Sequence, residues 1–386
     1  MPASKRPSEP RDPPRDPMTR LQDCWYTTVA SQMFLARDTF QLSQPSPPIP
    51  ASDAGLWAYE NSIPPLSLTF NRKASTGDMF FSEYAAIASQ IELPLEALGQ
   101  AIGPDNYEAW QEYLRKQDPA PAPSEIPKLF NTWACVYAPA VAAAGTAELS
   151  RLALLAGAKK ALDNYTAGES RPADFRGGYA DLLAMIERAP GAAISFDSRQ
   201  ADDNVADTWA GGLNTGCYGL WTGSSKESQI TREFAASEVK IEARFRSVMV
   251  WVSTPGDWYN SSLLNLAYSD AGSPPWRADA WPDWQEAFGE RGRMPRLIGS
   301  LVIVDGIDAT IWSDGRYDEP DQKAIVENSV AGLWPFHCPS GAAGRNEVRF
   351  DAGVGMMIRT VTEPGNPAVL GANVLGIARY LGHSQG

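Results

Sequence analysis

The period of the apolar pattern changes near residue 190, and this change constrains the fold more than any other feature of the chain. Before it, apolar residues recur at helical spacing, as in 19–42, which has no Gly or Pro. After it, 239–245 (VKIEARF) alternates like a half-buried strand, and 247–253 (SVMVWVS) is typical of a buried one. We therefore predict an α+β fold, in which an N-terminal helical region packs on a mainly antiparallel β-sheet. The predicted boundaries are 19–189 for the helical region and 190–386 for the β-rich region with its Trp-rich loops.

Other segments of the C-terminal part also indicate strands. The segments 346–352 and 356–361 are two of them. In 300–313 (SLVIVDGIDATIWS), two apolar runs flank Asp305 and Gly306. Asp-Gly favours a tight turn, because glycine tolerates positive φ. The pattern predicts a β-hairpin that turns at these two residues.

The first eighteen residues differ in composition from the rest of the chain. They are rich in Pro, and their acids and bases interleave without an apolar run. Such a segment cannot bury enough apolar area to offset the entropy of ordering it, so 1–18 is predicted to be a disordered tail. The tail also lacks the apolar centre of a signal peptide. Because the chain has only 4 scattered cysteines, a reduced, cytoplasmic setting is expected.

The net charge bears on the partners of the protein. The formal charge is -13 at pH 7, and we find no cluster of Lys and Arg that would match a phosphate backbone. We therefore expect no nucleic-acid partner. A small-molecule ligand is the expected partner, and the sequence leaves the cofactor unknown.

One segment, 129–158, raises the alternative of a membrane partner. It is apolar and rich in small residues, which allow helices to approach closely. Pro139, Gly145 and Glu148 interrupt it, and it has no run of about 18 apolar residues. The pattern favours a buried helical hairpin. The alternative is a pore-forming protein that keeps this hairpin hidden until it meets a membrane.

No catalytic motif is complete. His337 is the one histidine away from the C-terminus, and neither a G-x-S-x-G elbow nor an H-E-x-x-H pair is present. We interpret His337 as structural and predict no metal site. The acidic clusters 197–207 and 305–321 match no EF-hand, and turns and helix caps are the favoured explanation for them. The alternative is that their carboxylates bind Mg²⁺ or Ca²⁺. The Gly-rich segment 211–225 lacks a phosphate-binding motif and is interpreted as a loop or lid.

Tryptophans concentrate in the Pro- and Gly-rich segment 254–289. Each indole has roughly 200 Å² of surface, so the rings either anchor loops to the core or line a concave site. Interspersed acids favour the site, because aromatic walls with a few polar groups are typical of ligand pockets. We predict that Trp258, Trp276 and Trp281 bind substrate in one pocket.

Two acids are candidates for the catalytic carboxylate of this pocket, Asp257 and Asp305. The competing interpretation treats the aromatic rings as anchors only. Trp281, Trp284 and Phe288 lie at helical spacing, so they can form one face of an amphipathic helix.

Two classes of function follow. The first is an enzyme that acts on a small apolar or sugar-like metabolite by carboxylate acid/base chemistry in an aromatic-lined pocket. The second is a non-enzymatic protein, either membrane-acting and toxin-like or carbohydrate-binding. The sequence alone does not decide whether the protein is an enzyme.

Overall fold

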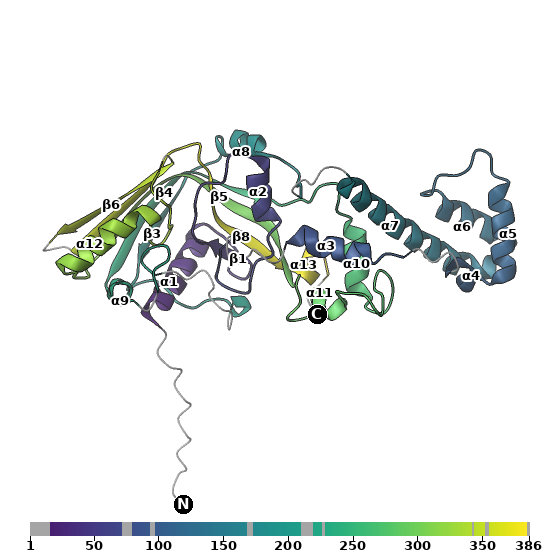
Figure 1. Cartoon of the computed structure of the whole chain (residues 1–386), viewed down its shortest axis with the longest axis horizontal. Coiled ribbons are helices and arrows are strands. Elements are labelled where there is room, and N and C mark those ends of the chain that lie inside the picture. Colours follow the sequence, from purple (N-terminus) through teal and green to yellow (C-terminus); the bar gives the residue numbers. More distant parts are fainter. Residues whose placement is uncertain are drawn as a thin grey trace, which may run out of the picture.

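An eight-stranded, mostly antiparallel sheet lies at the centre of the structure (Figure 1). The structure is a computed structural model that describes residues 16–71, 79–92, 97–167, 173–209, 219–225, 228–341, 343–351 and 355–383. Strands β4 (Val239–Val252) and β5 (Arg296–Ser313) pair along almost their full length. With helices before the sheet and around it, the α+β prediction is confirmed.

The strand β5 has two successive neighbours on its other side. Its first part pairs with β8 (Ala368–Gly376), and its second part pairs with β7 (Gly355–Thr362), which in turn pairs with β6 (Gly344–Asp351). On the far side of β4 lies β3 (Ala192–Asp197). The strands predicted near the end of the chain are therefore confirmed.

The hairpin predicted within 300–313 is wrong. The two apolar runs belong to one continuous strand, β5, and Gly306 lies inside it with a φ of 64°. Glycine still supplies a positive φ, but here it bends the strand where the neighbour changes from β8 to β7. The Asp305-Gly306 dipeptide does not end the strand, because the residues on both sides of it pair with neighbouring strands.

The N-terminal half contributes to the sheet, although its pattern predicted helix. The helix α1 (Pro17–Gln32) ends before β1 (Phe40–Ser43), which pairs with β8 and, in parallel, with β2 (Thr69–Phe70). All four β1 residues are buried. Residues 40–43 (FQLS) alternate apolar and polar, but four residues at the end of a longer helical pattern are too few for the period to separate strand from helix.

The helix α1 begins inside the predicted tail, so the tail boundary at residue 18 is wrong. Pro17 occupies the first turn, Asp16 accepts a hydrogen bond from the Thr19 backbone N–H, and Met18 is fully buried. Proline and an acidic cap are both favourable at a helix start. The rest of the predicted tail, 1–15, lies outside the described residues.

The remaining helices surround the sheet and extend from it. They are α2 (Asp53–Glu60), α3 (Phe80–Ser89), α4 (Ala97–Ile102), α5 (Pro104–Arg115), α6 (Ile126–Tyr137), α7 (Ala142–Thr166), α8 (Tyr179–Ile186), α9 (Gln229–Ala236), α10 (Ser261–Ser269), α11 (Trp284–Phe288), α12 (Glu319–Asn328) and α13 (Ile377–Tyr380). Short 3-10 turns occur at Pro139–Val141, Asp207–Trp209 and Ser329–Ala331.

The described residues form three apolar cores. The sheet core surrounds Trp25 of α1, which contacts Phe196, Trp334 and Phe336 edge to face. The base core lies beside the sheet and joins α3, α10 and the C-terminal half of α7 around Trp258. The arm core is formed by α4 to α7 and comprises Leu98, Ile102, Trp110, Phe130, Trp133 and Ala134.

Residues 97–166, called the arm below, project from the sheet (Figure 1). Helix α7 runs along the arm, α6 packs against it, and α5 lies at the outer end (Figure 1). The predicted hairpin in 129–158 is therefore present, but the expectation that it is buried is wrong: in the most apolar 18-residue window of Pro139–Thr166, 17% is buried. A small separate core, instead of the main sheet, covers its inner side.

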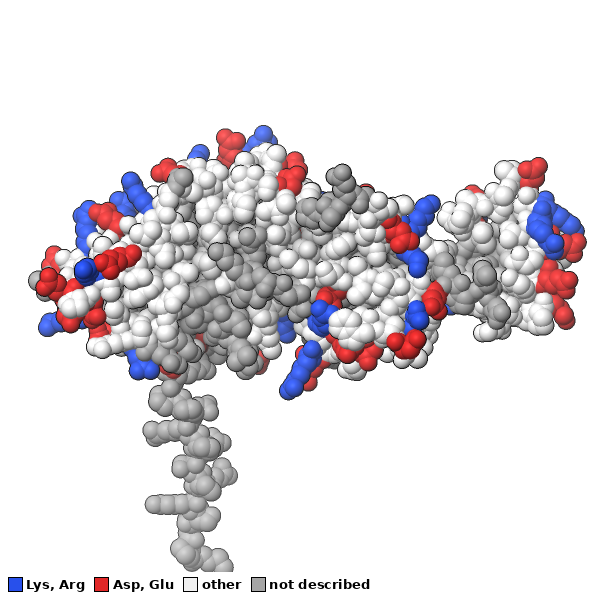
Figure 2. Space-filling view, viewed as in Figure 1, with Lys and Arg blue, Asp and Glu red and all other residues white. Residues whose placement is uncertain are grey.

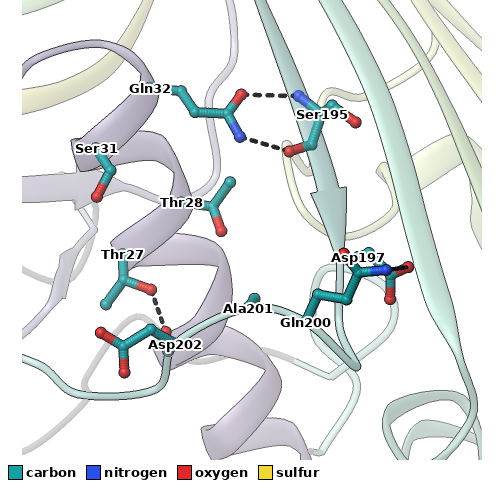
Figure 3. A pocket seen from close by; sticks show the side chains of 9 residues that line it. All are labelled: Thr27, Thr28, Ser31, Gln32, Ser195, Asp197, Gln200, Ala201 and Asp202. Atoms are coloured by element: carbon teal, nitrogen blue, oxygen red, sulfur yellow. Dashed lines mark hydrogen bonds between the residues drawn. The ribbon is translucent and has the colours of Figure 1, made fainter.

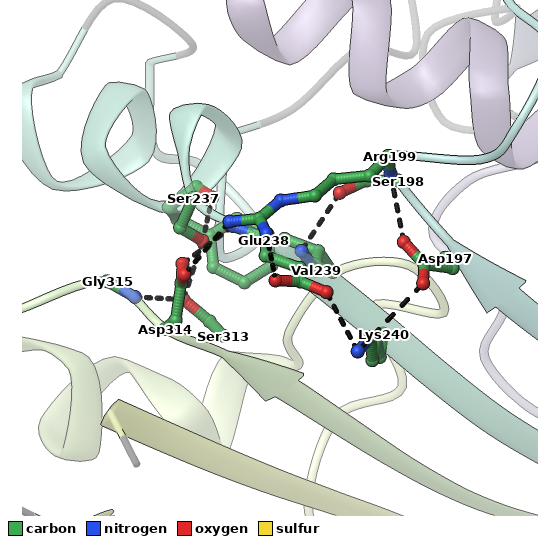
Figure 4. Close-up of polar contacts among 11 residues, drawn as sticks. Asp197, Ser198, Arg199, Ser237, Glu238, Val239, Lys240, Ser313, Asp314 and Gly315 are labelled. Carbon is green, nitrogen blue, oxygen red and sulfur yellow. Dashed lines mark hydrogen bonds and ion pairs between the residues drawn. The ribbon is translucent and has the colours of Figure 1, made fainter. Parts of the chain in front are cut away.

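Ion pairs tie together the strand ends opposite the arm (Figure 4). Arg199 contacts Glu238 at 2.6 Å and Asp314 at 3.3 Å, and Lys240 contacts Glu238 at 2.7 Å. Most of these side chains are half exposed or more, so each pair contributes little to stability. The cluster forms because the pairing of β3, β4 and β5 brings the ends of these strands together.

The start of α1 gives a first prediction. A chain that begins at Asp16 should keep the parent's melting temperature, whereas one that begins at Met18 should lose about 0.5–2 kcal/mol because it lacks the cap. Thermal and urea unfolding measure both. Equal stability of the two shortened chains would show that the cap contributes nothing. A loss in the first would show that 1–15 contributes to stability.

The bend in β5 gives a second prediction. Gly306→Val should destabilise the protein by at least about 1 kcal/mol, because the residue has positive φ and an added Cβ would lie 2.8 Å from the Arg246 Cβ. Gly376→Val is the matched control, since Gly376 has a φ of -56° and an added Cβ there meets nothing within 4 Å. Urea denaturation compares the two. A similar loss of unfolding free energy in both variants would show that the positive φ of Gly306 does not cause the destabilisation.

Candidate functional site

The three predicted substrate-binding tryptophans lie in different environments. Trp258 is fully buried in the base core, and its indole N–H donates to the Asp174 carbonyl at 2.8 Å. Trp276 is half-buried, and Trp281 is 59% exposed with the Arg293 guanidinium 4.7 Å from its ring centroid. A fully buried ring cannot contact a ligand, so the predicted common pocket is not formed by these three indoles.

The two predicted carboxylates do not complete such a pocket. The Asp257 side chain is 97% exposed and lies 3.7 Å from Arg176. Asp305 is buried, and its carboxylate accepts hydrogen bonds from the backbone N–H groups of Gly365 and Asn366 at 3.0 Å. This contact holds the connection between β7 and β8 against β5. A catalytic role for either acid stays a prediction, and the geometry gives it no support.

The helix expected around Trp284 is present as α11. Asp283 caps it, and Glu286 completes a capping box. Trp284 donates its indole N–H to the Tyr268 carbonyl at 2.8 Å, and Phe288 is buried against the same tyrosine. Most of the loop tryptophans are therefore anchors that fix irregular backbone to the base core.

Trp276 borders a cavity in the described part of the chain. The cavity has a volume of about 590 Å³ and lies between the end of α3, helix α7 and the loop that follows α10. Its walls are formed by Gln90, Ile91, Glu92, Lys159, Pro274, Pro275, Trp276 and Arg277. One aromatic face, an apolar floor and a cationic rim suit a small ligand.

A second, polar cavity lies between α1 and β3 (Figure 3). It has a volume of about 340 Å³, and hydroxyl, amide and carboxylate groups line it. The Gln32 amide donates to the Ser195 carbonyl at 2.6 Å and accepts from the Ser195 N–H at 2.9 Å. The side chain thereby replaces a neighbouring strand at the exposed edge of β3, which protects that edge. The Gln32 and Ser195 groups in the polar wall therefore have a structural role.

Glu60 is a buried carboxyl at the end of α2, between the sheet core and the base core. It is 1% exposed, and burial raises its pKa to about 8. Ser253 and Trp251 lower this pKa in part, but no hydrogen bond with good geometry reaches either oxygen. The carboxyl is therefore protonated at neutral pH. Because no solvent reaches it, it is a structural acid.

His337 and Cys338 are also buried side chains with shifted pKa values. Burial lowers the pKa of His337 to about 4 and raises the pKa of Cys338 to about 12. Both are therefore uncharged at neutral pH inside the sheet core, where His337 has a φ of 49°. The structural interpretation of His337 agrees with this position.

The acidic and Gly-rich segments have plain structural roles where they are described. Asp202 and Asp203 contact Arg37 and Arg20, and Asp318 caps α12. Most of the Gly-rich segment 211–225 lies outside the described residues, so its interpretation as a lid is untested. In the described part of the chain, no group of three His, Cys, Asp or Glu side chains is placed to hold a metal ion.

The outer surface of the arm is the other unusual feature. Val136 and Tyr137, at the end of α6, are 69% and 70% exposed. The same stretch exposes Cys135, Pro139, Ala140, Ala143, Ala144 and Ala147. Sequence reasoning recognised this segment but expected it to be covered. No family model, curated protein or solved structure matches the chain.

The buried carboxyl gives a third prediction. Since the folded pKa of about 8 lies above the ordinary 4.5, the protonated acid stabilises the fold, and this contribution is lost as the pH rises from 4.5 through 8. Glu60→Gln, which cannot ionise, should be more stable than the parent by at least about 1 kcal/mol at pH 8–9 and no more stable at pH 5. Melting curves across this range measure it.

The exposed Glu187 offers a matched control. Glu187→Gln should leave the pH dependence of the melting temperature unchanged. If Glu60→Gln follows the parent at every pH, Glu60 does not ionise on the alkaline side as argued.

Proposed function

We propose that the protein is a non-enzymatic, membrane-acting protein that inserts the connection between α6 and α7 into lipid. The observation that carries this proposal is the exposed apolar surface around Val136 and Tyr137. Exposed apolar patches of this kind mark interaction sites, because leaving them in water is unfavourable.

The charge distribution of the arm supports a lipid contact. From Leu129 to Ala147 the chain has no charged residue. Charged side chains gather at the outer end of the arm, over α5, and others lie on the later part of α7 (Figure 2). A stretch that enters hydrocarbon must lack unpaired charge, so the α6–α7 connection fits and α5 does not.

The long helix of the arm has membrane dimensions. Helix α7 has 25 residues and is about 38 Å long at 1.5 Å per residue, which exceeds the roughly 30 Å of a bilayer core. Pro139–Thr166 is long and apolar enough to cross a membrane. Its first two charges, Glu148 and Arg151, pair with each other at 2.5 Å. Such pairing lowers the cost of transferring them from water.

Aromatic rings lie next to the segment that we propose to enter the membrane. Trp133 contacts Trp110 and Tyr137 at centroid distances of 5.5 and 6.3 Å. Trp and Tyr favour the membrane interface, because each combines an apolar ring with a polar group. Of these three rings, Tyr137 is exposed and can contact the interface, and its contact with the buried Trp133 joins it to the arm core.

The enzymatic hypothesis has weaker support. Of its five candidate residues, Trp276 alone borders a described cavity. Glu60 has a pKa suited to proton transfer, but it is sealed from solvent. A general acid must reach the substrate directly or through one water.

The membrane proposal gives a fourth prediction. The purified protein should float with phosphatidylcholine vesicles and release a trapped dye, and Val136→Ser/Tyr137→Ser should weaken binding at least about tenfold, because two apolar side chains no longer enter the lipid. Since the protein is acidic, anionic lipid should not strengthen binding.

The matched control is Val326→Ser/Val330→Ser, which alters two exposed valines of the sheet body. This variant should bind vesicles like the parent. Equal losses in both double variants, or no vesicle binding by the parent, would contradict the proposal.

A further inference from the structure

We propose that the cavity at the base of the arm binds a small amphipathic anion, an aromatic carboxylate with an O–H or N–H donor. In this arrangement Trp276 contacts the ring and Lys159 pairs with the carboxylate. The inference concerns a different surface from the membrane contact and does not depend on it.

The walls of the cavity are preformed. The Trp276 indole N–H donates to the Ala267 carbonyl at 2.8 Å, which fixes the ring and leaves its face as the available surface. Ile91 and Pro275 are buried beneath the cavity and form an apolar floor. A volume of about 590 Å³ lies within the ordinary range for small-ligand sites. A flat aromatic ring matches the indole face, because offset stacking contributes beyond simple area burial.

The charges at the rim select an anion. Arg277 is neutralised by Glu92 at 2.8 Å and by Asp279 at 3.5 Å. Lys159 donates to the Ile91 carbonyl at 3.2 Å, and no carboxylate in the described part of the chain lies within 4.0 Å of it. Among the described residues this ammonium therefore has no ion pair, although Glu92 also lines the cavity. In an acidic protein, an ammonium without an ion pair beside an apolar cavity is a specific point of attraction for a carboxylate.

A polar group in the wall indicates a further requirement. Gln90 is 4% exposed, and its amide N–H₂ donates to the Pro282 carbonyl at 2.7 Å. Its amide oxygen is buried and has no hydrogen-bond partner. An unsatisfied acceptor is unfavourable, so a ligand whose donor reaches this oxygen when the wall of the cavity moves binds better than one without a donor. This favours a hydroxylated or amide-bearing aromatic acid over an unsubstituted one.

Isothermal titration calorimetry with four naphthalene probes tests this inference. We expect 2-naphthoate to bind the full chain, 6-hydroxy-2-naphthoate to bind more tightly, and 2-naphthalenemethanol and 2-naphthylmethylamine to bind at least about tenfold more weakly. The order of the four affinities distinguishes the contribution of the negative charge from those of the aromatic ring and of the hydrogen-bond donor. Equal affinity for all four probes, or no binding of either acid, would overturn the proposal.

Variants locate the binding site. Trp276→Ala should weaken 2-naphthoate binding about tenfold, and Lys159→Gln should remove the preference for the acid over the alcohol. The matched controls are Trp281→Ala, an exposed indole outside the cavity, and Lys160→Gln, the next residue of α7. Both controls should bind like the parent.

If Trp276→Ala does not fold, the comparison of Lys159→Gln with Lys160→Gln still tests the proposal. Lys159 and Lys160 lie on the same helix, and Lys159 alone of the two lines the cavity. If Lys160→Gln lowers the affinity for 2-naphthoate as much as Lys159→Gln does, the anion is held by general charge and the proposed site is wrong.

Discussion

The pairing of β4 with β5 is the constraint on which the rest of the structure depends. The ladder runs from Val239 opposite Ser313 to Val252 opposite Ser300, so it fixes which side chains of both strands face the sheet core. Because β5 is longer than any one neighbour, it accepts β8 and β7 in turn. The bend at Gly306 and the buried Asp305 carboxylate both lie where these neighbours change. The register of β4 against β5, the bend at Gly306 and the attachment of the β7–β8 connection at Asp305 all follow from the length of β5.

A second consequence is that the arm must have its own core. The sheet core is already closed by α1 and its aromatic contacts, so α4 and α6 pack on the outer half of α7, and α5 packs on α4. A core built from six buried side chains covers one side of a helix and leaves the other in solvent. The exposed connection after Tyr137 and the cavity beside Lys159 lie at opposite ends of the same helix, α7.

The aromatic residues show how the loops and the site are related. Trp258, Trp276 and Trp284 each donate an indole N–H to a backbone carbonyl, which pins Pro- and Gly-rich backbone to the base core. This anchoring explains why irregular segments contain so many large rings. At Trp276 the same hydrogen bond also fixes the free face of the ring toward a cavity. Anchoring and ligand binding are therefore compatible uses of one side chain.

The sequence by itself determined the α+β class, the alternation of 239–245 and the helical character of 126–162, because each follows from the local period of apolar residues. It did not determine that Phe40–Ser43 is a strand or that β5 is continuous, since both depend on partners far away in the chain. The candidate site was predicted less well: among the described residues, Trp276 borders a cavity, whereas Trp258 is buried in the base core. The local sequence around Lys159 and Gln90 does not indicate a binding role. That role depends on three separate segments that meet at the cavity and offer no partner to the Lys159 ammonium or the Gln90 amide oxygen. Tertiary packing alone decided which rings are buried, and that choice decides which residues can bind.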